Sequence, residues 1–387
     1  MDVKLTRAAA ACARTVFGDV RITGTHALRD QPGLMVARLE LQTGAGPQSV
    51  IVKLARPRER AALEVLTSAG VAAVPRLLAA TGDPPLVLMA DAGTSPSLAD
   101  RLLDADPATA AAAVSRWAVA LARVQAAGLE LGPAFRDRLA ALAAGAEPAT
   151  PDPDSYRNRF ARDRGVGWKV AVTRPGAAAV ITETIRGLRQ GLAPLGMTCG
   201  PQEAAELRAL AARLGPAAGP GALTPGDGCP DNNVDAPGGL VLVDLESAGV
   251  RHVAWDAAYL SVPWPTCWCS WRLPAAVQAA ALDRWRAILA PRLAPAAAAR
   301  LDDAVGDATI GWALITCAWF LGAAHRDEPL GPGGSLRPGP RELVQHRLGV
   351  AAAAGAGTVL GRLASRAQAA TRRAWGDRPL PLAPAWR

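Results

Sequence analysis

The chain has 387 residues, of which 50% are hydrophobic and 20% are charged, a composition typical of globular proteins and unlike that of disordered ones. At this length we expect two domains or lobes with a large buried core. The net charge of +8 permits a nucleic-acid partner, but the arginines are spread along the sequence and no basic run stands out. We therefore expect no nucleic-acid partner, with a basic nucleic-acid-binding protein as the alternative.

The first ninety residues are predicted to form mainly strands. "MVARLELQ" alternates between apolar and polar residues, whereas "SVIVKLA" and "PLVLMAD" are mostly apolar. Gly44 and Gly46 predict a hairpin turn between the first two of these strands. After Pro57, "RERAALEVLTSAG" has a helical composition that stops at Gly70. We therefore expect a small mixed sheet that carries one helix.

From about residue 97 onward the pattern becomes helical. Ser97 suits the N-cap of a first helix, and "ATAAAAVSRWAVALARVQAAG" predicts a long helix that ends at Gly128. Residues rich in Pro, Gly and acidic side chains predict loops at 143–155 and 330–340. Most of the remaining sequence reads as amphipathic or Ala-rich helix.

One uncharged segment, residues 308–324, is close to the lower limit of about 17 residues for crossing a bilayer. Charged residues flank it, and neither an aromatic belt nor a second such segment accompanies it. We therefore expect a buried helix and no membrane partner, with a membrane anchor as the alternative.

The cysteines favour a reducing compartment. They form no C-x-x-C pair and no zinc-ligand spacing with the four histidines. The start of the sequence lacks the basic-then-apolar pattern of a secretory signal. We therefore expect a cytoplasmic location, with the cysteines as reduced, small core residues. They are Cys12, Cys199, Cys229, Cys267, Cys269 and Cys317.

A polar cluster, "GDGCPDNNV" at 226–234, precedes a hairpin turn and the apolar strand "LVLVD". A solvated turn is one interpretation of this cluster. The order of loop, strand, turn and strand, however, places Asp227, Asn232 and Asp244 within a few ångströms of one another. Two carboxylates and an amide oxygen suit a hard cation such as Mg²⁺. A further acid held off the metal can orient a hydroxyl and accept its proton.

These segments resemble the aminoglycoside phosphotransferase and choline kinase group, small-molecule relatives of the protein kinases. "GDGCPDNNV" is similar to the group's H-G-D-x-x-x-x-N loop, "VLVDLESAG" to its I-D-[FW]-E-x-A-G strand, and "VAWDAAYL" to its D-x-A helix start. Upstream, Lys53 in an apolar strand and Glu59 in the next helix resemble the group's lysine–glutamate pair, with Glu64 as the rival. The resemblance covers about residues 20–265.

The resemblance implies an α+β, bilobal protein kinase-like fold. A small N-terminal β-sheet lobe with one helix would span residues 1–91, and a large, mainly helical C-terminal lobe residues 92–387. The implied activity is an ATP- and Mg²⁺-dependent transfer of phosphate to a hydroxyl of a small molecule, such as a metabolite, sugar, nucleoside or antibiotic.

Three departures from the group's pattern leave an alternative open. Pro225 stands where the group has its loop histidine, Gln125 stands where it has a histidine near the end of the long helix, and Gly33 is the only glycine of the expected nucleotide loop. The alternative is therefore a catalytically degenerate, nucleotide-binding pseudokinase that acts as a binding module.

The resemblance also implies roles for single residues. Asp227 would orient and deprotonate the acceptor hydroxyl, Asn232 and Asp244 would hold Mg²⁺, and Asp256 would support the catalytic loop from below. The residues implied to bind ATP are Lys53, Glu59, Met89, Ala90 and Asp91.

The acceptor site is expected just after the Asp256 helix. Trp264, Trp268 and Trp271 lie there among prolines and would form a stacking wall for a ring or sugar. The alternative is that these tryptophans belong to the core of the helical lobe. Cys229 and Asp231 are interpreted as loop residues only.

Overall fold

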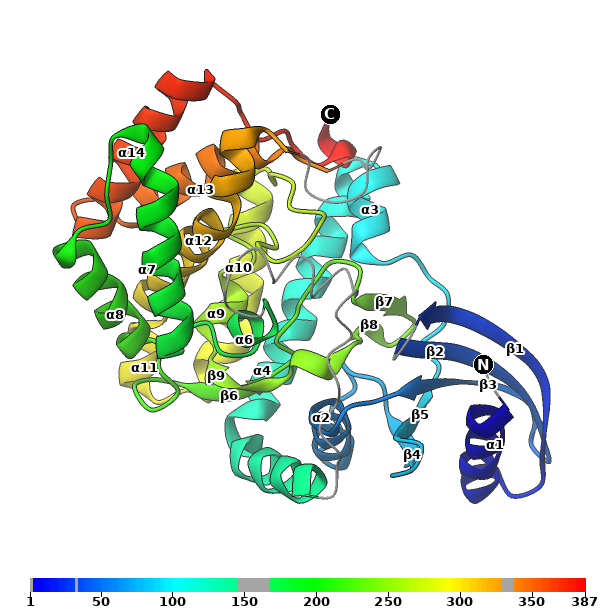
Figure 1. The fold of residues 1–387 in the computed structure, drawn as a ribbon. Coiled ribbons are helices and arrows are strands. Elements are labelled where there is room, and N and C mark those ends of the chain that lie inside the picture. The colour runs from blue at the N-terminus through cyan, green and yellow to red at the C-terminus, as the bar shows by residue number, and fades with distance from the viewer. Residues whose placement is uncertain (1–2, 32–33, 145–167, 329–336) are drawn as a thin grey trace.

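The computed structural model describes residues 3–31, 34–144, 168–328 and 337–387 (Figure 1). A five-stranded sheet forms the N-terminal part, and helices make up most of the larger remainder, which lies to one side of the sheet (Figure 1). The expected α+β class, with a small sheet lobe and a large, mainly helical lobe, is therefore confirmed.

The sheet has the strand order β1-β2-β3-β5-β4, and every neighbouring pair is antiparallel. The prediction of a mixed sheet is therefore wrong, because short connections join most of the neighbouring strands and no parallel crossover is made. The elements of this part are α1 (Val3–Phe17), β1 (Val20–Gln31), β2 (Leu34–Thr43), β3 (Gly46–Leu54), α2 (Pro57–Ser68), β4 (Leu77–Ala80) and β5 (Leu86–Ala90).

Strands β2, β3 and β5 and helix α2 form where the sequence predicts them, and Thr43 pairs with Gly46 across the predicted turn. Helix α1 and strand β1 were not predicted. Helix α1 covers one face of the sheet with small side chains such as Ala9 and Ala13, which carry no strong periodic signal. Strand β1 lies at the edge of the sheet, pairs with β2 and is mostly exposed, so it lacks the apolar alternation of an inner strand. Gly33 lies outside the described residues.

The two faces of the sheet contribute to different apolar cores. Val50 and Val52 of β3 point to α1 and belong to a core formed by that helix and the sheet. Ile51, between them, packs against a larger core that also contains α2 and the helical part. Lys53 shares the face of Ile51 because side chains alternate along a strand. Helix α2 contacts both the sheet and the long helix α4.

The remaining elements build the helical part and two small antiparallel two-stranded ladders, β6 with β9 and β7 with β8. The α-helices are α3 (Leu98–Asp104), α4 (Pro107–Ala144), α6 (Trp168–Thr173), α7 (Ala178–Leu192), α8 (Pro201–Arg213), α9 (Ala254–Ala257), α10 (Ala275–Leu289), α11 (Pro295–Ala299), α12 (Leu301–Arg326), α13 (Pro340–Ala354) and α14 (Val359–Trp375). The strands and 3₁₀ turns are β6 (Gly221–Thr224), β7 (Asn233–Ala236), β8 (Gly239–Leu242), β9 (Gly249–His252), η1 (Ala193–Leu195), η2 (Leu245–Ser247), η3 (Ala290–Arg292) and η4 (Pro384–Trp386).

Ser97 caps α3 as predicted, its side chain accepting from the Asp100 N–H. Of the two predicted loops, 143–155 lies almost wholly, and 330–340 largely, outside the described residues.

Helix α4 does not end at Gly128, as the sequence predicts, but continues to Ala144. The glycine allows a close approach and is not a helix terminus. A Cβ atom at Gly128 would lie 2.1 Å from the carbonyl oxygen of Leu223 in β6. The missing side chain therefore lets α4 pass directly against the strand that leads into the polar cluster.

We expect Gly128→Ala to lower the free energy of unfolding by about 1–3 kcal/mol, because the new methyl group overlaps a backbone oxygen. Gly132→Ala is the matched control in the same helix, since its Cβ would meet side chains of Val250 and Arg136 only at 3.4 Å or more. Urea unfolding of both variants measures the difference. Equal stability of the two variants would contradict the close contact between α4 and β6.

Among the described helices, α12 is the one that is long and apolar enough to cross a membrane, judged by length and composition. Of its most apolar window, 72% is buried inside the protein, and the helix contacts α7 and α13. This burial is what a core helix of a large helical lobe shows, as expected from the sequence.

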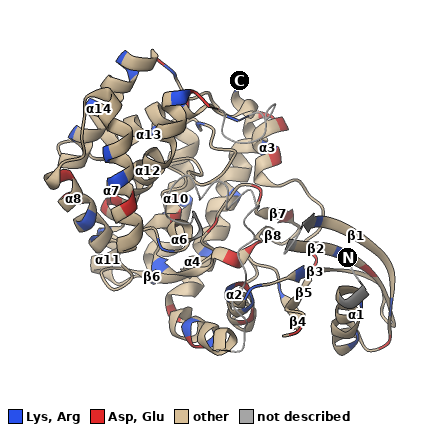
Figure 2. Ribbon diagram, in the orientation of Figure 1, with Lys and Arg blue, Asp and Glu red and all other residues tan. Residues whose placement is uncertain are grey.

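Basic and acidic positions both occur along the ribbon of the sheet and of the helices (Figure 2). Lys and Arg positions occur on α7, α8 and α14 as well as on the sheet, with acidic positions between them (Figure 2). Helix α14 carries four arginines and no acidic residue, whereas α7 and α8 carry residues of both signs.

Candidate active site

A cavity of about 230 Å³ lies between the inner face of the sheet and the segment around β7 and β8. Its lining includes all five residues implied to bind ATP and both residues implied to hold Mg²⁺. These are Lys53, Glu59, Met89, Ala90, Asp91, Asn232 and Asp244. The fold therefore brings residues that are up to 191 positions apart in sequence to one enclosed space.

Lys53 is a buried cation in the wall of this cavity and contacts two carboxylates. Its Nζ donates to Glu59 Oε1 at 2.7 Å and to Asp244 Oδ1 at 2.5 Å, while only 5% of the residue is exposed. Burial by itself would lower the pKa of Lys53, but the two carboxylates outweigh it and the pKa is raised. Lys53 therefore stays charged. Glu64, the rival partner, instead pairs with Arg60 and Arg138.

Glu59 lies in the first turn of α2, two residues after Pro57. Its carboxylate is almost fully buried, and burial raises its pKa although Lys53 opposes the shift. A buried carboxylate of this kind depends on its cation. The Lys53–Glu59 contact therefore joins strand β3 to helix α2.

Hydrogen bonds to the Asp91 side chain hold the segment that follows β5 in place. Its carboxylate accepts from Arg38 Nε at 2.6 Å and from the Gly93 N–H at 2.9 Å, and Ser49 also donates to it. Burial would raise the pKa of Asp91, but these donors, above all Arg38, lower it. Asp91 thus holds the chain at the edge of the cavity in an ionised form.

Backbone contacts place Asn232 beside the strand that delivers Asp244. The Asn232 N–H donates to the Cys229 carbonyl at 2.9 Å, and Nδ2 donates to the Asp227 carbonyl at 3.2 Å. The Val243 N–H in turn donates to the Asn232 carbonyl at 3.0 Å. Asp244 has a φ of 63°, a left-handed conformation that residues other than glycine seldom adopt. Such backbone strain is common at ligand sites.

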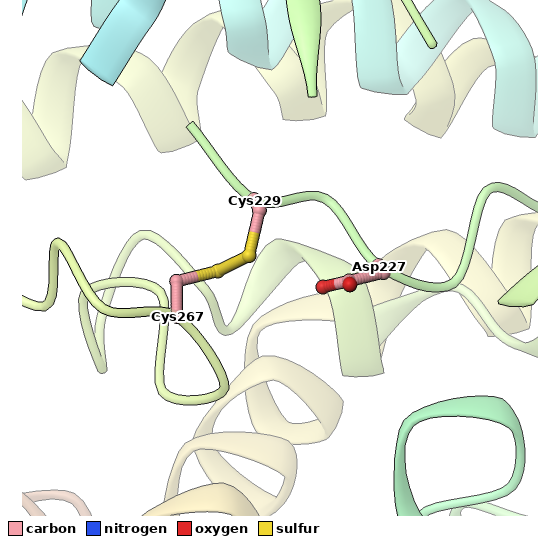
Figure 3. Close-up of side chains that lie close together, drawn as sticks. All are labelled: Asp227, Cys229 and Cys267. Carbon is pink, nitrogen blue, oxygen red and sulfur yellow. A yellow bond between two sulfur atoms is a disulfide. The ribbon is translucent and has the colours of Figure 1, made fainter. Parts of the chain in front are cut away.

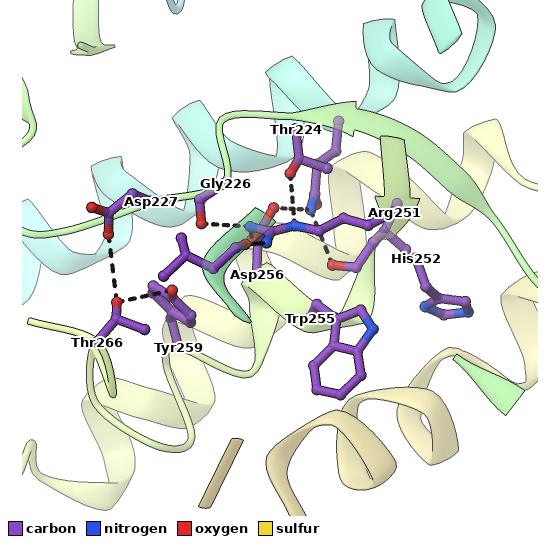
Figure 4. Close-up of polar contacts among 12 residues, drawn as sticks. Thr224, Gly226, Asp227, Arg251, His252, Trp255, Asp256, Tyr259 and Thr266 are labelled. Carbon is purple, nitrogen blue, oxygen red and sulfur yellow. Dashed lines mark hydrogen bonds and ion pairs between the residues drawn. The ribbon is translucent and has the colours of Figure 1, made fainter. Parts of the chain in front are cut away.

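The carboxylate of Asp227 points toward Thr266 in the loop after α9 (Figure 4). Only 4% of the residue is exposed, and Thr266 Oγ1 donates to its Oδ1 at 3.4 Å. Tyr259 Oη lies 3.0 Å from the same Thr266 hydroxyl. Asn232 and Asp244 therefore line the cavity. The Asp227 carboxylate instead contacts the loop that carries Thr266.

Asp256 contacts the loop that carries Asp227 through Arg251, a residue that was not predicted. Both are buried and form an ion pair, and Arg251 donates to the Gly226 carbonyl at 2.5 Å and to Thr224 Oγ1 at 3.1 Å (Figure 4). Burial raises the pKa of Asp256, although Arg251 opposes the shift. The ion pair thus holds the backbone immediately before Asp227. The signal in the sequence was an arginine inside a short strand.

Gln125 is fully buried and ties α4 to the segment before Asp256. Its Nε2 donates to the Val253 carbonyl at 3.0 Å and lies 3.4 Å from Asp256 Oδ2. Its Oε1 accepts from Trp285 Nε1 at 2.7 Å. Gln125 thus contacts Asp256 from α4, on the other side from Arg251 in β9.

The tryptophans do not form the expected stacking wall. Trp264 is fully buried, with its ring edge-to-face against Trp117 at 5.8 Å, and Trp271 is 3% exposed. Both are core residues of the helical part, the alternative left open by the sequence. Trp268 is half-buried, and its Nε1 donates to Asp231 Oδ2 at 2.9 Å.

The prediction that all six cysteines are reduced core residues is wrong for two of them. Cys229 and Cys267 form a disulfide across 38 residues, whereas the other four are free and buried. The Asp227 carboxylate and the two sulfurs lie within 4.8 Å of one another (Figure 3). Because the sulfurs are bonded to each other, this cluster offers no thiolates to a metal. It is also separate from the oxygen donors of Asn232 and Asp244.

No protein-family model matches the chain, and no curated protein matches it in sequence. Solved structures do resemble it. An ethanolamine kinase of Plasmodium vivax is 11% identical over 86% of this chain and 82% of its own, with a TM-score of 0.45. A choline/ethanolamine kinase family protein of Mesorhizobium loti is 16% identical over 95% and 99%, with a TM-score of 0.40. A spectinomycin phosphotransferase, in complex with ADP and spectinomycin, is 7% identical over 95% and 99%, with a TM-score of 0.42.

Proposed function

We propose that the chain is an ATP- and Mg²⁺-dependent phosphotransferase that phosphorylates a hydroxyl group of a small molecule. The observation that carries this proposal is the bridge that Lys53 makes to Glu59 and Asp244 across the wall of one cavity. A lysine held between a helix glutamate and a metal-binding aspartate is the arrangement with which kinases contact nucleotide phosphates.

The lining of the cavity supports a polyanionic ligand. Arg29, Arg38 and Lys53 contribute cationic groups from the sheet, while apolar side chains such as Ile51 and Met89 offer a surface for a base. Asn232 Oδ1 and the Asp244 carboxylate are oxygen donors, which fits Mg²⁺. When bound, Mg²⁺ would neutralise charge on the phosphates; in our proposal Asn232 and Asp244 hold it.

Asp227 is proposed to orient the acceptor hydroxyl and to accept its proton. Its carboxylate faces the Thr266 loop and not the nucleotide cavity, so the acceptor would approach from that side. The Arg251–Asp256 pair fixes the backbone before Asp227, which limits the reorganisation needed at the moment of transfer. Phosphoryl transfer depends mainly on such positioning and on charge neutralisation.

An ATP-consumption screen over hydroxylated metabolites, sugars, nucleosides and antibiotics tests this proposal, with the Asp227→Asn protein as the blank. We expect at least one acceptor to raise ADP release by the wild-type protein and not by the variant. ATP binding without turnover across the panel would instead support the pseudokinase alternative. Salt-sensitive DNA binding, unaffected by Asp227→Asn, would support the nucleic-acid alternative.

A further inference from the structure

The loop of residues 264–270 carries the hydroxyl that contacts Asp227. Thr266 Oγ1 donates to Asp227 Oδ1, and Tyr259 lies behind Thr266. Burial, with the nearby Asp227 carboxylate, raises the pKa of Tyr259, so its hydroxyl stays protonated. Thr266 gives its single proton to Asp227 Oδ1, so the protonated Tyr259 hydroxyl donates to Thr266 (Figure 4). Thr266 therefore orients the Asp227 carboxylate by a hydrogen bond and keeps its own proton.

The disulfide joins this loop to the catalytic loop next to the same contact. Cys229 is two residues after Asp227, and Cys267 directly follows Thr266. The sulfurs and the Asp227 carboxylate lie within 4.8 Å of one another, so the covalent link and the hydrogen bond are neighbours (Figure 3). A second tie between the two loops runs from Trp268 Nε1 to Asp231 Oδ2 at 2.9 Å.

The far side of the 264–270 loop is held independently of the catalytic loop. Arg347 in α13 donates to the Pro265 carbonyl at 3.1 Å, and Ser270 Oγ donates to the Trp264 carbonyl at 2.5 Å. The loop therefore keeps its place in the helical part without the disulfide. What the disulfide adds is a fixed distance between Thr266 and Asp227.

We propose that Thr266 is a positioning residue for Asp227 and that the Cys229–Cys267 disulfide maintains this positioning, which makes turnover dependent on the redox state. This inference rests on the proposed function of Asp227. In the oxidised protein the Thr266 hydroxyl fixes the carboxylate toward the acceptor. In the reduced protein only hydrogen bonds join the two loops, Thr266 to Asp227 and Trp268 to Asp231, so the distance between Thr266 and Asp227 is no longer fixed and Asp227 loses its orientation.

The proposed switch requires a dithiol reductant. Its thiolate attacks Sγ of Cys267, the more exposed of the two cysteines, and forms a mixed disulfide while Cys229 leaves as a thiolate and takes up a proton. The second thiol of the reductant then displaces Cys267, which is also protonated. Two electrons and two protons reach the protein, and the reductant becomes a disulfide. In a reducing compartment, disulfides are usually transient and redox-sensing.

The first experiment compares oxidised and dithiothreitol-reduced wild-type protein, with the disulfide state verified by thiol counting. Turnover is followed as ADP release from Mg²⁺-ATP, with water or an acceptor found in the screen. We expect kcat to fall about tenfold to a hundredfold on reduction and KM for ATP to change by less than about twofold. Reoxidation should restore kcat.

Two variants separate the disulfide from other effects of reductant. The Cys229→Ser/Cys267→Ser protein should have the low kcat in both conditions. Cys199→Ala, which changes a buried free cysteine far from Asp227 in sequence, should respond to reductant as the wild type does. Amide hydrogen exchange at residues 226–232 should be faster in the reduced protein, whatever the acceptor. Equal kcat in both redox states, or equal sensitivity of the double variant, overturns the inference.

The hydroxyl of Thr266 is tested by a matched pair of substitutions. Thr266→Val keeps the shape of the side chain and removes the donor, so kcat should fall about tenfold with KM for ATP retained. Thr266→Ser keeps the donor and should restore most of kcat. An equal loss in both variants would indicate a packing role and overturn the positioning role.

These outcomes are distinguishable from failure of the proposed function itself. If oxidised wild-type protein shows no turnover with water or with any acceptor, the phosphotransferase proposal fails, and the role assigned to Thr266 fails with it. If turnover is present but insensitive to the disulfide and to Thr266, only the positioning inference fails.

Discussion

Asp227→Asn is expected to lower kcat by about 10²–10⁴-fold, the range that a positioned general base contributes. The asparagine keeps the shape of the side chain but accepts no proton at neutral pH. ATP affinity should be nearly unchanged, because Asp227 faces Thr266 and is absent from the lining of the nucleotide cavity. Steady-state kinetics and equilibrium ATP binding measure the two effects separately.

Asp235→Asn is the matched control for this substitution. Asp235 lies in β7, eight residues further along, and pairs with Arg116 at 2.8 Å near the surface. Removing a partly exposed ion pair of this kind costs little stability, so its kcat should equal that of the wild type. Unchanged activity of Asp227→Asn would refute the role given to Asp227.

Lys53→Met is expected to abolish turnover, to weaken ATP binding and to destabilise the fold. The substitution leaves Glu59, which is 2% exposed, without its cation. Breaking a buried ion pair on one side costs about 3–5 kcal/mol. Asp244 is more exposed than Glu59 and should contribute less to this loss. Urea unfolding and ATP titration give the two readouts.

The double variant Lys53→Met/Glu59→Gln separates stability from function. Replacing the orphaned carboxylate by a neutral amide should recover much of the unfolding free energy, because the charge that made burial costly is gone. ATP binding and turnover should remain as low as in Lys53→Met. A single variant as stable as the wild type would show that Lys53 and Glu59 are not buried together.

Residue chemistry and periodicity predicted a substantial part of the structure. An apolar strand makes an unpaired lysine costly, so Lys53 called for a nearby acid, and the resemblance to the phosphotransferase group favoured Glu59 over Glu64. Strand alternation predicted β2, and the apolar runs predicted β3 and β5. The motif around Asp244 identified the residues that line the cavity. The roles of these residues in binding and catalysis remain predictions.

Long-range packing explains what the sequence did not reveal. Gly128 has the appearance of a helix end, and only the approach of β6 in three dimensions shows why a side chain is excluded there. A spacing of 38 residues does not identify Cys229 and Cys267 as partners. Trp264, Trp268 and Trp271 follow helix α9, as the sequence shows. Whether their rings face solvent depends on how the loop after α9 packs, and the sequence does not show that packing.

The division of the sheet between two apolar cores has a consequence for how the protein loses its structure. The core around α1 and the core around α2 share strands but no buried side chain. Lys53 lies in β3, which contributes side chains to the smaller core. Its ion pairs with Glu59 and Asp244 connect β3 to α2 and to the segment after β8, which belong to the larger core. The sheet with α1 is thus a candidate for separate, earlier melting under denaturant. A ligand that touches both walls of the cavity would make the two melt together, at a higher denaturant concentration.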